Sequence, residues 1–530
     1  MKKGLFKTRQ LSLAALCGFM LTLASCANEN IVQKKTDTDN NNDKNLTTFA
    51  TGTAPESRTS MDYNSGAFFW EAGDYIYVKD DDNVWQKSSN APTTQTAYFK
   101  FKVPGKFAAK TSYKVYYPGK NGNKDQVTIS AAQTQTEPNT TTHLGESGDC
   151  GTADATKVTG KNQFEFKLDH QAAYLVFQPY TSNTVLKNCY ITKIEVNSDN
   201  DISSTYTLDP TTGELTGTGT GKQIVLTTKG SGAYVNGFPL TNTSADVATN
   251  GAFMIIKPGT HTFKIRYWVK DIVTNVEGTI TKVLISHKFD KNKYYNMTAS
   301  LDVRDYDGNH YYLWDAGEQC WKGHEWNQGG SQPTLNEDGV NPSSAYNDYP
   351  KNNSDPRWHS EAYPGYGIKN DAQTALFKSL PNVNEMTWYA FGGDPRWDAD
   401  ELWTTMGHLY KGGMWFLKKG YISGYSAEHA YDGSDWRIIR KEEYNLNLLP
   451  NLPSAAEINK YFYLPATGYY NYYSGLQFCG QNGMYWSSSA GVLNNGLGYN
   501  MNIFNGGLMV TLEGRQNSLR AQPFSDFGED

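Results

Sequence analysis

Short runs of apolar and β-branched side chains alternate with polar ones from about Leu46 to Val303, and Gly, Asn, Asp and Pro separate the runs. The clearest runs are residues 75–78, 113–117, 164–168, 174–177 and 263–267. Alternation with a period of two buries one side of a strand, and frequent turn residues favour antiparallel pairing. No helical period longer than two turns occurs in this region. The pattern predicts half-buried antiparallel strands that form β-sandwiches.

The pattern changes after about Arg304, and ten of the thirteen tryptophans lie beyond this point. Residues 398–411 have acids in the first turn, a shared apolar face and glycines just past the end, so they predict a helix. A capping box from Ser454 to Glu457 predicts a second helix, which runs into the aromatic residues 461–464. This part of the chain is therefore expected to be α+β.

The N-terminal residues have the features of an export signal followed by a tether. Basic residues between positions 2 and 9 precede an apolar stretch, residues 11–23, which is shorter than the roughly 20 residues that a membrane-spanning helix needs. Residues 27–45 contain almost no apolar side chains and cannot offset the entropy of ordering. We expect a cleaved signal and a disordered tether.

Leu23, Ala24, Ser25 and Cys26 close the apolar stretch and resemble the lipobox of bacterial lipoproteins. The resemblance implies a lipoprotein signal over residues 1–26, diacylation of the Cys26 thiol and a surface-exposed place in the cell outer membrane. Two acyl chains hold a protein stably on a membrane. The alternative is an ordinary secretory signal followed by an incidental cysteine.

Composition narrows the range of partners. The net charge of −6 and the lack of a basic cluster argue against a nucleic-acid partner. Beyond the signal, the chain has four cysteines, Cys150, Cys189, Cys320 and Cys479, which are too few for a disulfide scaffold. One disulfide in each half is an alternative to four free thiols, and sequence does not fix the pairing.

Five stretches resemble, in order, the fimbrillin-like proteins of the Bacteroidetes: residues 58–62, 69–78, 113–118, 164–177 and 294–299. The resemblance implies two transthyretin-like β-sandwich modules, residues 46–160 and 161–303. It also implies a type V pilus, in which a protease removes the first strand of a lipidated precursor and a donor strand from another subunit fills the groove. An extended donor covers both the apolar surface and the unpaired backbone groups.

Arg58 is the candidate for processing. A trypsin-like protease cuts after a basic residue, and Arg58 ends a loop-like segment, residues 54–58. The alternative is a charge at the edge of a strand, because Arg58 and Thr59 belong to the local pattern of the fimbrillin-like proteins.

The C-terminal region resembles the C-type-lectin-like domains of bacterial surface proteins. The resemblance rests on residues 435–438 with Glu442 and Glu443, then on residues 462–469, 485–489 and 515–520. It implies a C-type-lectin-like domain over residues 304–530, although residues 305–430 match loosely and leave its start open. Residues 304–530 lack the triplets Glu-Pro-Asn, Gln-Pro-Asp and Trp-Asn-Asp, so calcium-dependent sugar binding is not implied.

Tyr469, Tyr470, Asn471, Tyr472 and Tyr473 form the candidate ligand site. Aromatic faces stack on the C–H faces of sugars, and the neighbouring Asn supplies a polar partner. We expect part of this cluster to be exposed, so that replacing Tyr470 and Tyr472 leaves the melting temperature nearly unchanged. The alternative is that half of the rings fill the core. The same core role is the favoured interpretation for Trp486.

The sequence predicts neither a metal ion nor another cofactor. Asp394, Asp398 and Asp400 lie close together, but helix capping explains the last two better than metal binding does. No zinc-protease, serine-hydrolase, phosphate-loop or paired-cysteine zinc motif occurs, so no catalytic residues are expected. A carboxylate pair for glycoside hydrolysis stays open, because sequence does not reveal distances in space.

The first functional hypothesis is a tip or accessory adhesin of a fimbrium, with other pilus subunits as partners through strand exchange. Its receptor would be a host or bacterial glycan or a protein. The tip is favoured because a further domain follows the second sandwich, which leaves no free C-terminal strand to donate. The alternatives are a surface lipoprotein that binds glycans without polymerising, and a cryptic carbohydrate-active enzyme.

Overall fold

The computed structural model describes residues 45–52, 60–61, 63, 68–334, 348–352, 354–358, 372–471, 475–493 and 496–529. The expected signal with Cys26, almost all of the tether, and Arg58 lie outside these residues. The described chain is mainly β, as the hydrophobic pattern predicts, and its strands form several sheets. Among the described residues, no helix is long and apolar enough to cross a membrane.

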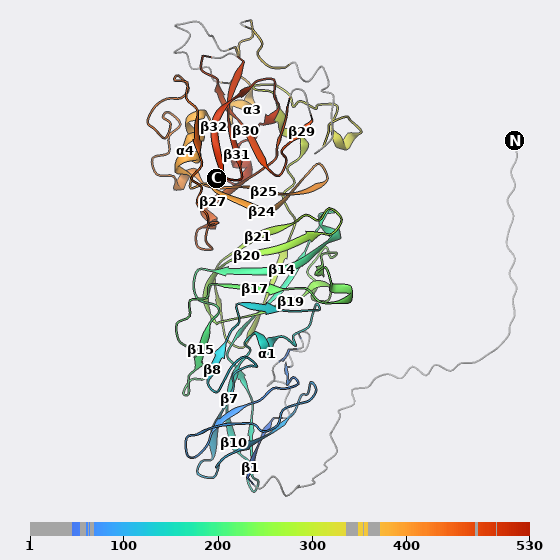
Figure 1. Ribbon diagram of the computed structural model, residues 1–530, viewed down its shortest axis with the longest axis vertical. Helices are drawn as coiled ribbons and strands as arrows, with labels where there is room; N and C mark the ends of the chain where they lie inside the picture. The colour runs from blue at the N-terminus through green and yellow to red at the C-terminus, as the bar shows by residue number, and fades with distance from the viewer. Residues whose placement is uncertain are drawn as a thin grey trace, which may run out of the picture. The chain divides into compact units, whose positions relative to one another are not determined.

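The first sheet, drawn in blue and cyan in Figure 1, has the strand order β5-β4-β7-β10-β11-β1-β6, with β12 paired to β10. Its strands are β1 (Leu46–Thr51), β4 (Tyr77–Lys79), β5 (Trp85–Lys87), β6 (Lys100–Pro104), β7 (Ser112–Tyr117), β10 (Gly151–Lys157), β11 (Gln163–Phe166) and β12 (Asp169–His170). Tyr113 and Val115 of β7 are buried in a core that also contains Phe49 and Trp70. The period-two pattern in this region is confirmed.

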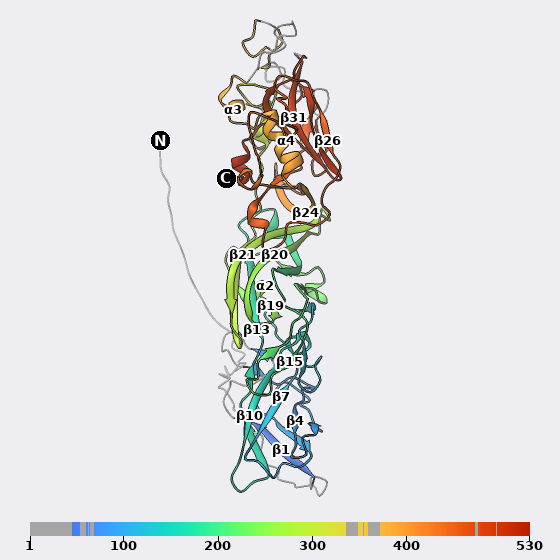
Figure 2. The ribbon, with the colours of Figure 1, turned by 90° about the vertical axis from the view of Figure 1, so that its left-hand side faces the viewer.

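Two further sheets enclose a second core. The smaller sheet has the order β19-β13-β22, and the larger sheet includes β21-β20-β14-β17-β9, mostly green in Figures 1 and 2. These strands are β9 (Ala132–Thr134), β13 (Ala173–Tyr180), β14 (Cys189–Ser198), β17 (Gln223–Thr227), β19 (Ala252–Ile256), β20 (Gly259–Asp271), β21 (Glu277–Phe289) and β22 (Lys293–Ser300). Leu175, Val196 and Phe253 are fully buried between the sheets.

The two sandwiches are interleaved along the chain. The boundary expected between residues 160 and 161 falls between β10 and β11, which are paired in the first sheet. Upstream of this boundary, β9 pairs with β17 of the larger sheet.

The remaining short strands and helices of these two sandwiches are β2 (Ser60–Met61), β3 (Phe68–Phe69), β8 (Gln126–Thr128), β15 (Thr205–Leu208), β16 (Leu215–Thr216), β18 (Phe238–Pro239), α1 (Leu144–Ser147) and α2 (Val247–Asn250).

The C-terminal part, orange and red in Figure 1, is built on a six-stranded sheet and helix α4 (Val383–Gly392). The sheet order is β23-β33-β30-β31-β32-β26. Its strands are β23 (Tyr311–Tyr312), β26 (Glu443–Asn445), β30 (Asn482–Ala490), β31 (Leu497–Phe504), β32 (Gly507–Gly514) and β33 (Leu519–Arg520), beside β28 (Tyr469–Tyr470), β29 (Leu476–Gln477) and α3 (Ala375–Lys378). Asn382 and Glu385 form a capping box that fixes the start of α4.

A strand hairpin joins the C-terminal part to the second sandwich. β24 (Arg396–Thr405), β25 (His408–Leu417) and β27 (Tyr461–Pro465) extend the larger sheet, because β24 pairs in parallel with β21 at Thr279 and Glu401. Residues 304–306, which lead from the second sandwich into the C-terminal part, are also hydrogen-bonded to β24. The Thr404 amide donates to Arg304 O at 3.1 Å, and the Tyr306 amide donates to Thr404 O at 2.8 Å.

The helix expected over residues 398–411 is wrong, because these residues form most of the β24–β25 hairpin. Met406 and Gly407 have φ values of 47° and 77°, as the two central residues of a type I′ turn require. A bulge between Asp398 and Leu402 also interrupts the alternation of β24, which hides the period of two.

The helix expected after Ser454 is also wrong. The Ser454 hydroxyl donates to Glu457 Oε2 at 2.9 Å, but only one 3₁₀ turn, Ile458–Lys460, precedes β27.

The expectation that the strands pair only in the antiparallel direction is incomplete. β1 runs parallel to β11, and β13 runs parallel to β22.

Candidate functional site

The candidate site for strand exchange between subunits is the strand slot, which we define as the space that β1 fills between β6 and β11. β1 pairs antiparallel with β6 over five positions and parallel with β11 over four. It therefore satisfies backbone hydrogen bonds on both of its edges. Its flanking segments, residues 27–44 and 53–59, lie outside the described residues, so the structure does not place the Cys26 and Arg58 sites.

Phe49 anchors β1 in the strand slot. Its side chain is fully buried, and its ring stacks on Phe164 with the centroids 5.1 Å apart and meets Phe107 edge to face at 5.1 Å. The Thr51 hydroxyl accepts from the Phe99 amide at 3.0 Å. Loss of β1 would therefore uncover apolar rings and leave the facing edges of two strands unpaired.

The tyrosine cluster is divided between core and surface. Tyr470 is fully buried, and its hydroxyl donates to Pro333 O at 2.5 Å while its ring packs against Tyr311 and Trp321. The expectation of an exposed ring is therefore wrong for Tyr470, because its side chain lies on the side of β28 that faces the core. Tyr472 and Tyr473 lie outside the described residues.

Tyr469 of this cluster has a neighbour, Phe478, that no sequence motif indicates. Tyr469 and Asn471 are partly exposed, and the Tyr469 ring stacks on Phe478 with the centroids 6.1 Å apart. Phe478 is 46% exposed and has a φ of 57°, which is rare for an aromatic residue. Trp486, by contrast, is buried and donates to Tyr312 O, which confirms its core role.

The three aspartates near the start of β24 take separate partners. Asp394 pairs with Arg396, Asp400 with Lys411, and Asp398 with an arginine from another strand. Among the described residues, no group of three His, Cys, Asp or Glu side chains is arranged to hold a metal ion.

The partner of Asp398 is Arg266 on β20, and the two form a buried ion pair where the C-terminal part meets the second sandwich. Arg266 Nη2 donates to Asp398 Oδ1 at 2.9 Å and to Thr279 Oγ1 at 2.8 Å. Trp415 Nε1 donates to the other Asp398 oxygen at 3.2 Å. Asp398 is 2% exposed and Arg266 7% exposed, so each charge depends on the other.

Glu401 lies beside this ion pair, and Thr281 holds its carboxylate. The Thr281 amide donates to Oε1 at 2.9 Å and the Thr281 hydroxyl to Oε2 at 2.6 Å. Glu401 is partly exposed as a residue, but its carboxylate is shielded from water. This desolvation, with the nearby charge of Asp398, raises the pKa of Glu401 to about 7.

We expect stability to fall as pH rises from 4.5, the ordinary pKa of Glu401, to about 7. In this window the folded state holds a proton that the unfolded state has lost, so this group contributes a decrease of at most about 1.4 kcal/mol per pH unit. Glu401→Gln should remove that slope in urea unfolding at pH 5, 6, 7 and 8. An identical slope in the variant would contradict the assignment.

The four described cysteines are free thiols, and all are buried. The alternative of one disulfide in each half is therefore not what the structure shows. Burial raises the pKa of Cys189 and of Cys320 to about 12, and it also raises the pKa of Cys150 and of Cys479. Thiols in this state are poor nucleophiles.

No protein-family model matches the chain, and no curated protein is significantly similar to it. Among solved structures, a fimbrial protein from Bacteroides ovatus is 10% identical, covers 90% of this chain and 98% of its own, and has a TM-score of 0.27. A candidate cell adhesion protein from the same species is 15% identical, with coverages of 48% and 92% and a TM-score of 0.28. A fimbrial anchor protein from Porphyromonas gingivalis is 11% identical, with coverages of 45% and 82% and a TM-score of 0.21.

Proposed function

We propose that the chain is a fimbrial-type surface subunit that is exported as a lipoprotein and accepts a donor strand in the strand slot. The observation that carries this proposal is the placement of β1, a six-residue strand near the N-terminus that fills a gap between two strands and buries Phe49. Its partners are then other subunits of a fimbrium, and its membrane contact is the lipid on Cys26.

Within a fimbrium, the chain fits the tip or an accessory position. The last strand of the second sandwich, β22, is paired with β13 of the same chain. The chain then continues along β24 into the C-terminal part, so β22 has no free end to donate. This subunit accepts a strand and donates none, and its C-terminal part is the adhesive module.

The strand slot can be tested with two forms of the chain, residues 27–530 and residues 59–530. The shorter form lacks β1 and should bind a synthetic peptide of residues 46–51 or self-associate, while the longer form stays monomeric in analytical ultracentrifugation. A peptide with Phe49→Asp is the matched control and should not bind, because it would bury an unpaired charge. Monomeric behaviour of both forms without peptide binding would refute strand exchange.

The alternative is a surface lipoprotein that binds glycans without polymerising. Mass spectrometry of surface material separates the two. An N-terminus beyond residue 45 without lipid supports strand removal, whereas acylated Cys26 in all of the material supports the alternative. The proposal assigns no catalytic role to the chain, in keeping with the buried cysteines, and turnover of a polysaccharide by the purified protein would overturn that part of it.

A further inference from the structure

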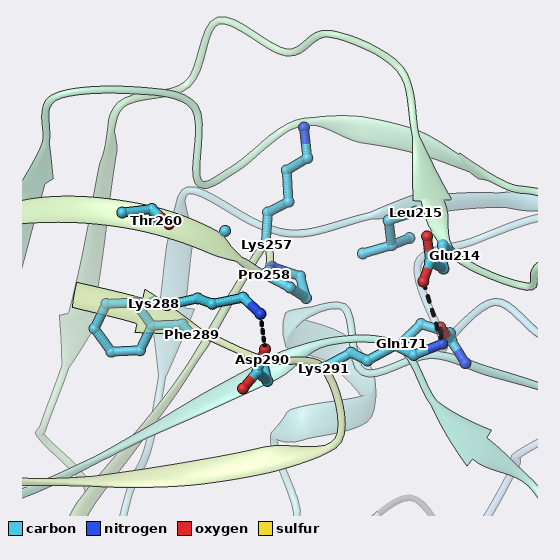
Figure 3. Close-up of a pocket in the computed structure, with 11 residues that line it drawn as sticks. Gln171, Glu214, Leu215, Lys257, Pro258, Thr260, Lys288, Phe289, Asp290 and Lys291 are labelled. Carbon is cyan, nitrogen blue, oxygen red and sulfur yellow. Dashed lines mark hydrogen bonds and ion pairs between the residues drawn. The ribbon is translucent and has the colours of Figure 1, made fainter. Parts of the chain in front are cut away.

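A pocket of about 400 Å³ lies at one end of the second sandwich (Figure 3). Two of its walls are residues 257–260, which follow β19 and begin β20, and residues 288–291, which end β21 and begin the turn before β22. Glu214 and Leu215 at the start of β16 and Gln171 between β12 and β13 complete the lining. Ligand sites commonly have volumes of roughly 300–1,000 Å³ and often lie between domains.

Contacts within the protein hold the polar lining in place. Lys291 Nζ donates to Gln171 Oε1 at 3.1 Å and lies 3.6 Å from Glu214 Oε1. Next to it, the Asn292 amide donates to Ala172 O at 2.8 Å, which attaches this turn to the link between the sandwiches. Donors and acceptors that are ordered before binding reduce the entropy lost when a ligand binds.

The charges around the pocket are paired. Lys288 lies 2.9 Å from Asp290, and Lys257, whose ammonium lies over Tyr206, is 3.1 Å from Asp201. With Lys291 beside Glu214, each of the three lysines has a carboxylate partner. Because each ammonium is balanced by a nearby carboxylate, the lining presents little net charge to attract a strongly acidic or basic ligand, which favours a neutral one.

The lining also indicates which neutral chemistry fits. Ammonium and amide groups donate, and carboxylates accept, so the pocket offers both kinds of partner to a group that can do both. Hydroxyl groups have this property, and hydrogen bonds to charged groups are the stronger ones. Leu215 and Pro258 add apolar surface between the two ion pairs seen in Figure 3, which suits the C–H face of a sugar ring.

We propose that this pocket binds the end of a neutral oligosaccharide. The site is separate from the strand slot and from the tyrosine cluster, and it does not depend on assembly into a fimbrium. It places a sugar contact on the second sandwich, in addition to the adhesive role proposed for the C-terminal part.

The test begins with a glycan array probed with the full chain, followed by calorimetric titration of the neutral glycan that binds best. Thr260 is exposed at the rim, so Thr260→Trp should fill the pocket and lower the affinity at least ten-fold while the melting temperature stays unchanged. Lys291→Met should also lower the affinity at least ten-fold. Lys229→Met, at an exposed lysine that does not line the pocket, is the matched control and should bind as the parent does.

Three outcomes would overturn the proposal: no neutral glycan binds, only charged glycans bind, or Thr260→Trp binds as tightly as the parent. The Thr260→Trp result decides the case even if Lys291→Met proves unstable. Because β1 stays in place in the full chain, failure here leaves strand exchange untouched, and failure of strand exchange leaves this site untouched.

Discussion

Replacing Arg266 with methionine is expected to lower the free energy of unfolding by about 3–5 kcal/mol, the range typical of breaking a buried ion pair from one side. The variant keeps most of the apolar stem but leaves Asp398, which is 2% exposed, without its cation. Urea unfolding followed by tryptophan fluorescence measures the effect, because Trp415 donates to the same carboxylate.

Two further variants sharpen this test. Lys411 Nζ lies 3.4 Å from Asp400 Oδ1, and this ion pair is more exposed than the one between Arg266 and Asp398. Lys411→Met breaks it and should lower the free energy of unfolding by less than about 1 kcal/mol. Adding Asp398→Asn to Arg266→Met should recover part of the loss, since the unpaired charge is then gone. A loss below about 1 kcal/mol for Arg266→Met alone would show that Asp398 does not depend on the arginine.

The second large effect is expected at Phe49, where replacement with alanine should cost about 3–5 kcal/mol. The ring is fully buried and touches aromatic rings from β11 and from the loop after β6, so the variant leaves a cavity beside β1. Unfolding in urea gives the loss, and hydrogen exchange at the backbone of β6 and β11 reports whether β1 then leaves the strand slot more often.

Thr48→Ala is the matched control for Phe49→Ala. Thr48 precedes Phe49 on β1 and points to the opposite side of the strand, where it is half-buried. Its replacement should cost less than about 1 kcal/mol and leave hydrogen exchange nearly unchanged. Equal losses in the two variants would mean that the Phe49 ring does not hold β1.

The strands of the sandwiches could be predicted because burial on one side imposes the period of two directly on the sequence. β11 follows it throughout, and β7 follows it in its first four residues. The pairing partner of each strand and its direction could not be predicted, since a strand buries the same alternate positions whether its partner is parallel or antiparallel. For this reason the sequence does not show that β1 runs parallel to β11 and antiparallel to β6.

The C-terminal part was harder to predict because local signals conflict there with tertiary contacts. Acids before an apolar stretch are a helix signal, but in β24 Asp398 is buried against Arg266, a residue 132 positions away. Helix α4 did carry a readable signal in Asn382 and Glu385 after Pro381. Adjacent residues of a strand face opposite sides, and the sequence does not show which of Tyr469 and Tyr470 faces the core.

The attachment of residues 304–306 to β24 has a mechanical consequence. Force applied to the C-terminal part would not stretch a slack linker, because residues 304–306 are hydrogen-bonded to Thr404 of β24. The load would pass through the hairpin to the long strands β20 and β21 by way of the Arg266–Asp398 pair. Dissolved ions screen a buried ion pair only weakly. The force that this contact withstands should therefore vary little with salt concentration.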